Sequence, residues 1–347
     1  MKKLLSLLAL GLAAALSAFA AQAADKVLYF YNWSEYLPEA VLDQFTAETG
    51  IKVVYTTYDS NEAMYAKLKV LQGGGYDLVV PSTYYVSKMS KEGLIQPIDK
   101  TKLGNFKNLD PRLLNQPYDP DNRYSVPYLW GSTGIGVNAK DVDPATVTSW
   151  ADLWRPEFRG KIVLLNDLRE VFYLGLKVLG YSGNDTDPAH IAQAYDKLTS
   201  LIPGVRVFNA DSPKEPFLSG EVVIGQIWNG EAYLGREELP ELTYIYPKEG
   251  AALWMDNLVI PAKAEHVAEA HQLIDFLLRP EIAKVISEEI GYATPNKAAL
   301  PLLDAAVRDD RTVYPNDDDL KNSEFQVDVG EAITVYEQYW EKLKIGQ

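Results

Sequence analysis

Residues 26–81 read KVLYFYNWSEYLPEAVLDQFTAETGIKVVYTTYDSNEAMYAKLKVLQGGGYDLVVP. Three stretches in this segment are rich in the β-branched and aromatic residues that favour strands: 26–32, 52–58 and 77–81. Between them, Pro38 begins a helical stretch that Gly50 ends, and a second helical stretch stops at the three glycines 73–75. A strand–helix–strand–helix–strand order with short connections predicts a mostly parallel sheet that is flanked by helices on both faces.

The same alternation resumes in the second half of the chain. The strand-like stretches there are 161–166, 221–228, 242–246 and 253–261. The helical stretches are 171–179, 191–201, 267–278 and 329–343. No internal repeat and no flexible linker separates the two halves. The pattern therefore predicts two α/β lobes between which the chain crosses more than once.

The N-terminus has the pattern of a signal peptide. Lys2 and Lys3 supply the positive charge, residues 4–20 form a nearly unbroken apolar run, and Ala21-Gln22-Ala23 has the small-x-small pattern of a cleavage site. As a membrane anchor the run is barely long enough, and the cleavage site ends it. We therefore predict that residues 1–23 are removed and that the mature chain is exported to the periplasm.

The composition excludes several classes of site. The chain of 347 residues has no cysteine, so disulfides and thiolate-bound metals are excluded. Its formal net charge of −15 disfavours nucleic acid and anionic membranes as partners and mildly favours cationic ones.

Catalytic motifs are missing from the sequence. The three histidines are His190, His266 and His271, and we expect all three at the surface. Their spacing does not match a zinc-protease motif, and the chain has neither a phosphate-binding loop nor a serine-nucleophile elbow. The glycines of 131–136 are in the wrong order for a dinucleotide loop, and we expect them at a crossing between the lobes. These observations argue against an enzyme and predict neither a cofactor nor a metal.

Aromatic and polar residues gather instead where predicted strands and helices end. The positions are Trp33, Ser34, Glu35, Tyr36, Ser82, Tyr84, Asp167, Arg169, Glu170, Trp228, Trp254, Asp256 and Tyr292. In open α/β sheets, ligands bind beyond the carboxyl ends of the strands, so these side chains are expected to converge. Aromatic faces attract ammonium groups and pack against methylenes, while carboxylates supply counter-charge. Each residue alone is more often a core or capping residue, but together they favour a cage for a thin cation with several charges.

Five stretches carry a resemblance to a known family. They are LYFYNW at 28–33, YDLVVPSTYY at 76–85, VTSWADLW at 147–154, WMD at 254–256 and GY at 291–292. In these stretches the chain resembles the periplasmic spermidine/putrescine-binding proteins of polyamine ABC transporters, and the likeness extends along nearly the whole mature chain. The resemblance implies a two-lobed periplasmic-binding-protein fold of type II that closes over its ligand without catalysis.

The resemblance also implies roles for individual residues. The aromatic cage corresponds to Trp33, Tyr36, Tyr84, Trp228, Trp254 and Tyr292, and the acidic positions to Glu35, Asp167, Glu170 and Asp256. Gln326 and Arg169 are implied as further cleft residues. Four carboxylates facing three ammonium groups suit spermidine, with norspermidine and putrescine as other candidate ligands. Two positions depart from the family pattern: Ser34 stands in place of threonine, and Ala210 in place of a serine whose hydroxyl would help to hold one terminal ammonium.

We expect an N-terminal lobe of 25–132 plus 256–300 and a second lobe of 133–255 plus 301–347, with the ligand cleft between them. The expected partners are a polyamine and the permease subunits of an ABC importer, and the protein is expected to be a monomer. Two alternatives remain: a binding protein for another cationic amine or an amino acid, and an exported amine-processing enzyme. An amino-acid site would need an arginine in the cleft for the carboxylate, for which Arg169 is the one candidate.

Overall fold

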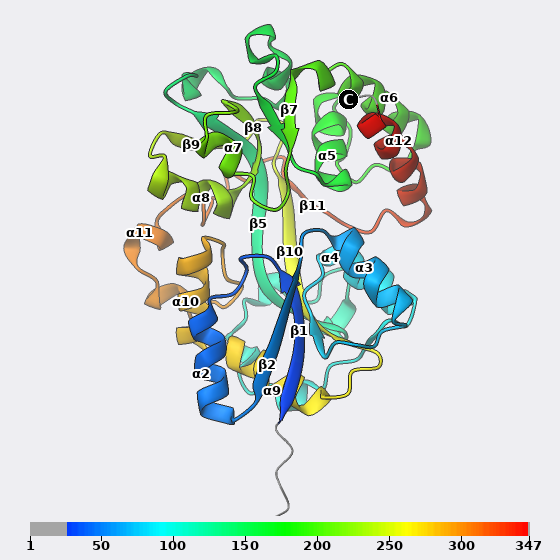
Figure 1. The fold of residues 1–347 in the computed structure, drawn as a ribbon, viewed down its shortest axis with the longest axis vertical. Helices are drawn as coiled ribbons and strands as arrows, with labels where there is room; N and C mark the ends of the chain where they lie inside the picture. The colour runs from blue at the N-terminus through cyan, green and yellow to red at the C-terminus, as the bar shows by residue number, and fades with distance from the viewer. Residues whose placement is uncertain (1–25, 346–347) are drawn as a thin grey trace, which may run out of the picture.

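Two α/β bodies are stacked end to end and joined by long strands in the computed structural model, which describes residues 26–345 (Figure 1). The predicted signal peptide lies outside the described residues. The strands are β1 (Val27–Trp33), β2 (Lys52–Tyr58), β3 (Leu78–Val79), β4 (Ile95–Gln96), β5 (Ser125–Asn138), β6 (Ile162–Leu164), β7 (Val205–Phe208), β8 (Ile224–Trp228), β9 (Leu242–Ile245), β10 (Ala252–Pro261) and β11 (Glu324–Phe325). The α-helices are α2 (Glu39–Thr49), α3 (Asn61–Val70), α4 (Thr83–Lys91), α5 (Leu168–Val178), α6 (Pro188–Thr199), α7 (Glu215–Leu218), α8 (Asn229–Glu238), α9 (Val267–Leu277), α10 (Pro280–Ile290), α11 (Ala305–Arg308) and α12 (Ile333–Ile345). Within this part of the chain, no helix combines the length and the apolar character that a membrane crossing needs.

The sheet consists of two parallel parts with an antiparallel pair between them. Its order is β2-β1-β3-β10-β5-β8-β6-β7. Strands β2, β1 and β3 are parallel in one body, and β8, β6 and β7 are parallel in the other. The long strands β5 and β10 pair antiparallel with each other and run from one body to the other (Figure 1). The predicted parallel α/β pattern is confirmed in each body, while the antiparallel link was not foreseen.

Local signals in the sequence set the limits of several helices. Gly50 ends α2 and Gly291 ends α10, both in the left-handed conformation (φ 71° and 76°) that glycine adopts without steric cost. Asp167 caps α5, because its carboxylate accepts hydrogen bonds from the backbone N–H groups of Arg169 and Glu170.

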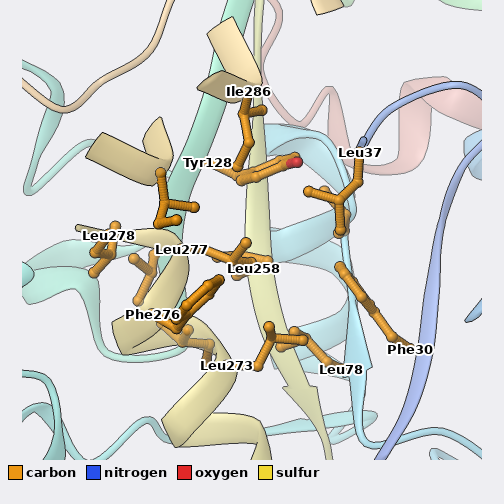
Figure 2. Close-up of a cluster of buried hydrophobic side chains, with 14 of the residues drawn as sticks. Phe30, Leu37, Leu78, Tyr128, Leu258, Leu273, Phe276, Leu277, Leu278 and Ile286 are labelled. Carbon is orange, nitrogen blue, oxygen red and sulfur yellow. The ribbon is translucent and has the colours of Figure 1, made fainter. Parts of the chain in front are cut away.

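Each body has its own hydrophobic core. In the first, Phe30 of β1, Leu258 of β10 and Phe276 of α9 point toward one another (Figure 2). The second core includes Trp150 and Phe172, both fully buried. Burying one side chain of this size contributes about 1.5–3 kcal/mol, so each body holds its own end of the sheet rigid.

The expectation that all three histidines lie at the surface is wrong for His271. Its ring is buried on α9, where Nε2 accepts a hydrogen bond from the Asp99 backbone N–H at 3.0 Å and Nδ1 donates to the Val267 carbonyl at 2.7 Å. These two bonds satisfy a neutral imidazole, which is why the ring can be buried without a charged partner. His190 and His266 are partly exposed, and each faces a carboxylate.

Candidate functional site

A cavity lies between the two bodies, with about 750 Å³ of empty space when its open mouth is included. Its walls come from the β1–α2 loop, the start of α4 and β10 on one side, and from α5, β8 and α8 on the other. The predicted site residues that line it are Trp33, Ser34, Glu35, Tyr36, Ser82, Tyr84, Asp167, Glu170, Trp228, Trp254, Asp256, Tyr292 and Gln326. The fold therefore brings together thirteen of the fourteen predicted residues.

Arg169 is the predicted site residue that does not line this cavity. It is 1% exposed, and its guanidinium donates to the Val327 carbonyl at 3.0 Å and to Asn184 Oδ1 at 2.9 Å. The guanidinium carbon lies 5.3 Å from the centre of the Tyr84 ring, so the arginine stacks against a residue of the cavity wall. The guanidinium therefore binds acceptors of the protein itself and does not face a ligand in this cavity.

The Asp256 carboxylate is held by two hydroxyl groups from the neighbouring elements. Tyr36 donates to Oδ2 at 2.7 Å and Ser82 donates to Oδ1 at 2.6 Å. A β-bulge between Asp256 and Asn257 breaks the register of β10 against β5 at this point. Burial raises the pKa of Asp256 to about 6, even though both hydroxyl groups favour its charged form. The carboxylate is therefore oriented but short of positive charge.

Trp254 and Asp256 were predicted near the start of an apolar strand, 253–261, and the structure confirms this strand. Both lie within β10. They reach the cavity because β10 passes through the boundary between the two bodies, so that the middle of this strand borders the cleft.

A second acidic pair lies on the first turn of α5. Asp167 and Glu170 are both buried. Burial, and then the neighbouring Asp167 charge, raise the pKa of Glu170 to about 8; burial also raises the pKa of Asp167. Two carboxyl groups this close and this poorly hydrated favour a cation between or beside them.

The aromatic walls depend on two glycines. A Cβ at Gly131 would lie 2.6 Å from the Trp254 ring, and a Cβ at Gly230 would lie 2.4 Å from the Tyr292 ring. Because neither glycine has a side chain, Trp254 and Tyr292 can lie against the backbone and meet edge to face, with ring centres 5.0 Å apart. Trp33 is fixed by a hydrogen bond of 2.9 Å from its indole N–H to the Val80 carbonyl.

Three cavity-lining side chains have a buried polar atom without a hydrogen-bond partner. They are Glu170 (Oε2), Trp254 (Nε1) and Gln326 (Nε2). An unpaired buried polar atom costs about 1–3 kcal/mol. A polar ligand in the cleft would remove part of that cost, most directly by donating to the Glu170 oxygen.

The charge of the cavity wall is of one sign. Of the described residues that line it, seven are carboxylates and none is a lysine, arginine or histidine; the acids are Glu35, Asp59, Asp167, Glu170, Asp211, Glu231 and Asp256. Seven lining residues are aromatic: Trp33, Tyr36, Tyr58, Tyr84, Trp228, Trp254 and Tyr292. In residues 26–345, no group of three or more histidine, aspartate or glutamate side chains is arranged to hold a metal ion.

Several residues that line the cavity were not predicted from the sequence. They are Tyr58, Asp59, Asn61, Asp211, Glu231, Leu234 and Ile290. Tyr58 ends the predicted strand 52–58 and Asp59 follows it, so the same strand-end pattern was present there. Asp211 was not found because the short strand β7 before it was not predicted. Ala210, noted as a departure from the family pattern, also lines the cavity.

Two lobes joined by strands and facing each other across a cleft define the two-lobed solute-binding proteins with a type II fold. The chain belongs to the bacterial extracellular solute-binding protein family, whose model matches residues 40–315. It is 57% identical over 342 residues to the spermidine/putrescine-binding periplasmic protein of Escherichia coli (strain K12), covering 98% of each chain. The spermidine/putrescine-binding periplasmic protein 1 of Haemophilus influenzae is 47% identical over 329 residues, which cover 94% of this chain and 91% of that protein.

The fold has a solved counterpart at similar length. The putative spermidine/putrescine ABC transporter structure from Listeria monocytogenes is 40% identical, covers 93% of this chain and 100% of its own, and superimposes with a TM-score of 0.89. The family, the two-lobed α/β fold and the assignment as a binding protein rather than an enzyme are thereby confirmed.

Proposed function

We propose that this chain binds a linear polyamine, spermidine by preference, in the periplasm and delivers it to the permease subunits of an ABC importer. The observation that carries the proposal is the composition of the cavity wall, with seven carboxylates, seven aromatic rings and no basic residue among the described lining residues. Carboxylates attract the ammonium groups, and ring faces accommodate both ammonium and methylene groups. The relatives named as spermidine/putrescine-binding proteins point to the same ligand class.

The burial of the acids favours a ligand with several charges over one with a single charge. Asp256 and the pair Asp167–Glu170 are buried on different elements, and burial raises the pKa of all three carboxyl groups. A ligand with one ammonium could compensate one of these groups and would leave the other unpaired. A triamine supplies one ammonium to Asp256, one to the pair Asp167–Glu170, and has a third ammonium for another carboxylate of the wall.

The amino-acid alternative finds no support in this cavity. A bound amino acid needs a cation for its carboxylate, and the one arginine proposed for that role, Arg169, is occupied by Val327 and Asn184 outside the cavity lining. A ligand carboxylate would instead meet like charge on both walls.

We further propose that the lobes comprise 25–132 plus 256–300 and 133–255 plus 301–347, and that they close over the ligand. The two separate hydrophobic cores support this division, because the buried residues of each come from one lobe, except Trp254 at the boundary, which packs in the first core. The carboxylates that belong to different lobes, Asp256 and Glu170, would then be bridged by one ligand.

Calorimetric titration with a panel of amines tests the proposed ligand. Spermidine is expected to bind most tightly, norspermidine within about tenfold of it, and the diamine putrescine clearly more weakly, because putrescine leaves at least one carboxylate unpaired. N-acetylspermidine keeps the carbon chain but loses one terminal charge, so it should resemble putrescine. Putrescine binding as tight as spermidine binding would contradict the three-ammonium interpretation, and a panel without any binding would remove the proposed function.

Trp254→Leu is expected to weaken spermidine binding by at least about 1.4 kcal/mol, which is tenfold in affinity, because the ammonium loses an aromatic face. Trp254 also belongs to the core of the first body, so the unfolding temperature should fall as well. Trp150→Leu is the matched control, since Trp150 is fully buried in the other core and does not line the cavity. The control should lower the unfolding temperature and leave affinity per folded molecule unchanged; the same result for Trp254→Leu would make Trp254 a core residue only.

A further inference from the structure

An ion pair of the protein itself lies at the mouth of the cleft. Lys214 Nζ is 3.1 Å from each carboxylate oxygen of Glu231 and 3.4 Å from Glu35 Oε2. Ser212 Oγ, at 3.1 Å, is its fourth neighbour. Glu35 follows β1 in one body, whereas Lys214 and Glu231 belong to the other, so the contact crosses the cleft.

The pair differs from an ordinary surface salt bridge because it is largely buried. The side chains of Lys214 and Glu231 are 12% and 10% exposed, while that of Glu35 is 72% exposed. Burial alone lowers the pKa of Lys214, but the Glu231 and Glu35 carboxylates outweigh it and the pKa is raised. The lysine therefore remains an ammonium ion at neutral pH.

Glu35 and Glu231 both belong to the cavity wall that the proposed ligand would occupy. Glu231 lies on the first turn of α8, next to the cavity residues Trp228 and Tyr292. Glu35 is held with a φ of 50°, a left-handed conformation that is unusual for a glutamate and that projects it from the β1–α2 loop. Lys214 is not part of the wall, but its ammonium fills the place where these two carboxylates meet.

The carboxylates of the cavity wall differ in whether a basic side chain of the protein pairs with them. The carboxylates of Asp256, Asp167 and Glu170 have no lysine or arginine among their salt-bridge partners. Glu35 and Glu231, in contrast, share the ammonium of Lys214, which offsets one of their two negative charges. An additional ligand ammonium arriving at this end would have to share these two carboxylates with the Lys214 ammonium, whose like charge repels it.

We propose that Lys214 acts as a specificity residue that caps the Glu35–Glu231 end of the cleft with an internal ammonium and so limits the ligand to three charges. The proposal rests on the proposed polyamine-binding function. It assigns to Lys214 the exclusion of the tetraamine spermine relative to spermidine.

Titration of Lys214→Gln with spermine and spermidine tests it. The substitution removes the charge and leaves a polar side chain, so the fourth ammonium of spermine gains two carboxylates. We expect the ratio of spermine affinity to spermidine affinity to rise at least fivefold over that of the wild type. A rise in this ratio of less than fivefold overturns the proposal. An equal increase in affinity for spermine and spermidine also overturns it, because Lys214 would then compete with both ligands and would not discriminate by their number of charges.

Two further variants separate this role from simpler ones. Lys214→Gln combined with Glu231→Gln removes the buried one of the two freed carboxylates, so the ratio should return to within threefold of the wild type; a ratio that stays high overturns the proposal. Lys91→Gln removes a lysine that also bridges distant segments, through Asp328 at 2.6 Å, but lies away from the cavity wall, and it should leave the ratio unchanged. If Lys91→Gln raises the ratio as much as Lys214→Gln does, the effect comes from lobe closure and the proposal fails.

The failure of this proposal can be distinguished from the failure of the proposed function. If the wild type binds spermidine but Lys214→Gln does not change the ratio, only the role of Lys214 is excluded. If the wild type binds no polyamine, the proposed function and the role of Lys214 are both excluded.

Discussion

Asp256→Asn is expected to weaken spermidine binding by about 2–5 kcal/mol, because truncating one partner of a buried, hydrogen-bonded charge pair leaves the other charge unpaired. The substitution keeps the shape of the side chain and an acceptor for one of the two hydroxyl groups, from Tyr36 or Ser82. In titration calorimetry the loss corresponds to roughly 30-fold to several thousand-fold in the dissociation constant.

The same variant should be more stable than the wild type when no ligand is present. Burial raises the pKa of Asp256 to about 6 in the folded protein, well above the ordinary value of an aspartate. A carboxyl group whose folded pKa is raised destabilises the fold increasingly as pH rises through that value. Removing the charge at pH 7 should therefore raise the unfolding temperature of the ligand-free protein.

Asp77→Asn supplies the matched control for Asp256→Asn. Asp77 is equally buried, but it accepts backbone N–H groups from Tyr29, Glu265 and His266 outside the cavity. The control should lose stability and keep its affinity. An Asp256→Asn protein whose spermidine affinity stays within twofold of the wild type would exclude a role for this carboxylate in binding.

Spermidine binding is expected to weaken by at least about 100-fold between pH 8 and pH 5, because two buried carboxyl groups take up protons that compete with the ligand. In the ligand-free protein the pKa of Glu170 is raised to about 8 and that of Asp256 to about 6. A bound ammonium favours the charged carboxylate and lowers both values, so each group releases a proton on binding when the pH lies below its ligand-free pKa. Affinity should therefore rise with pH and level off above about pH 8.

Calorimetry at pH 7 in buffers of different ionisation enthalpy measures this proton release directly. We expect a net release of close to one proton per ligand, contributed mainly by Glu170. Glu170→Gln should bind more weakly at every pH and lose most of the pH dependence between pH 7 and pH 8. If the affinity is constant from pH 6 to pH 8 and no proton is released at pH 7, the raised pKa values of Glu170 and Asp256 are not coupled to ligand binding, and this prediction is wrong.

Local signals in the sequence were sufficient for much of the fold. Pro38 and Gly50 bound α2, and Asp167 caps α5, because helix ends depend on residues within a few positions of one another. Strand β7 was missed because four residues of mixed burial give no clear period. The pairing of β5 with β10 joins residues more than a hundred positions apart, and no short-range pattern encodes it.

For the site, the sequence alone indicated the chemistry, since aromatic rings and carboxylates without cysteine or catalytic motifs favour a cationic ligand. Which of these groups face the cleft depends on how the two bodies fold and meet. The tertiary structure directs Arg169 away toward Val327, and it places Trp254 and Asp256 at the boundary in mid-strand. It also brings Lys214 to Glu35 across 179 positions of the chain. The physical reason is that residue type fixes what a side chain can bind, while burial, pKa and partner choice depend on contacts between segments that meet only when both lobes have folded.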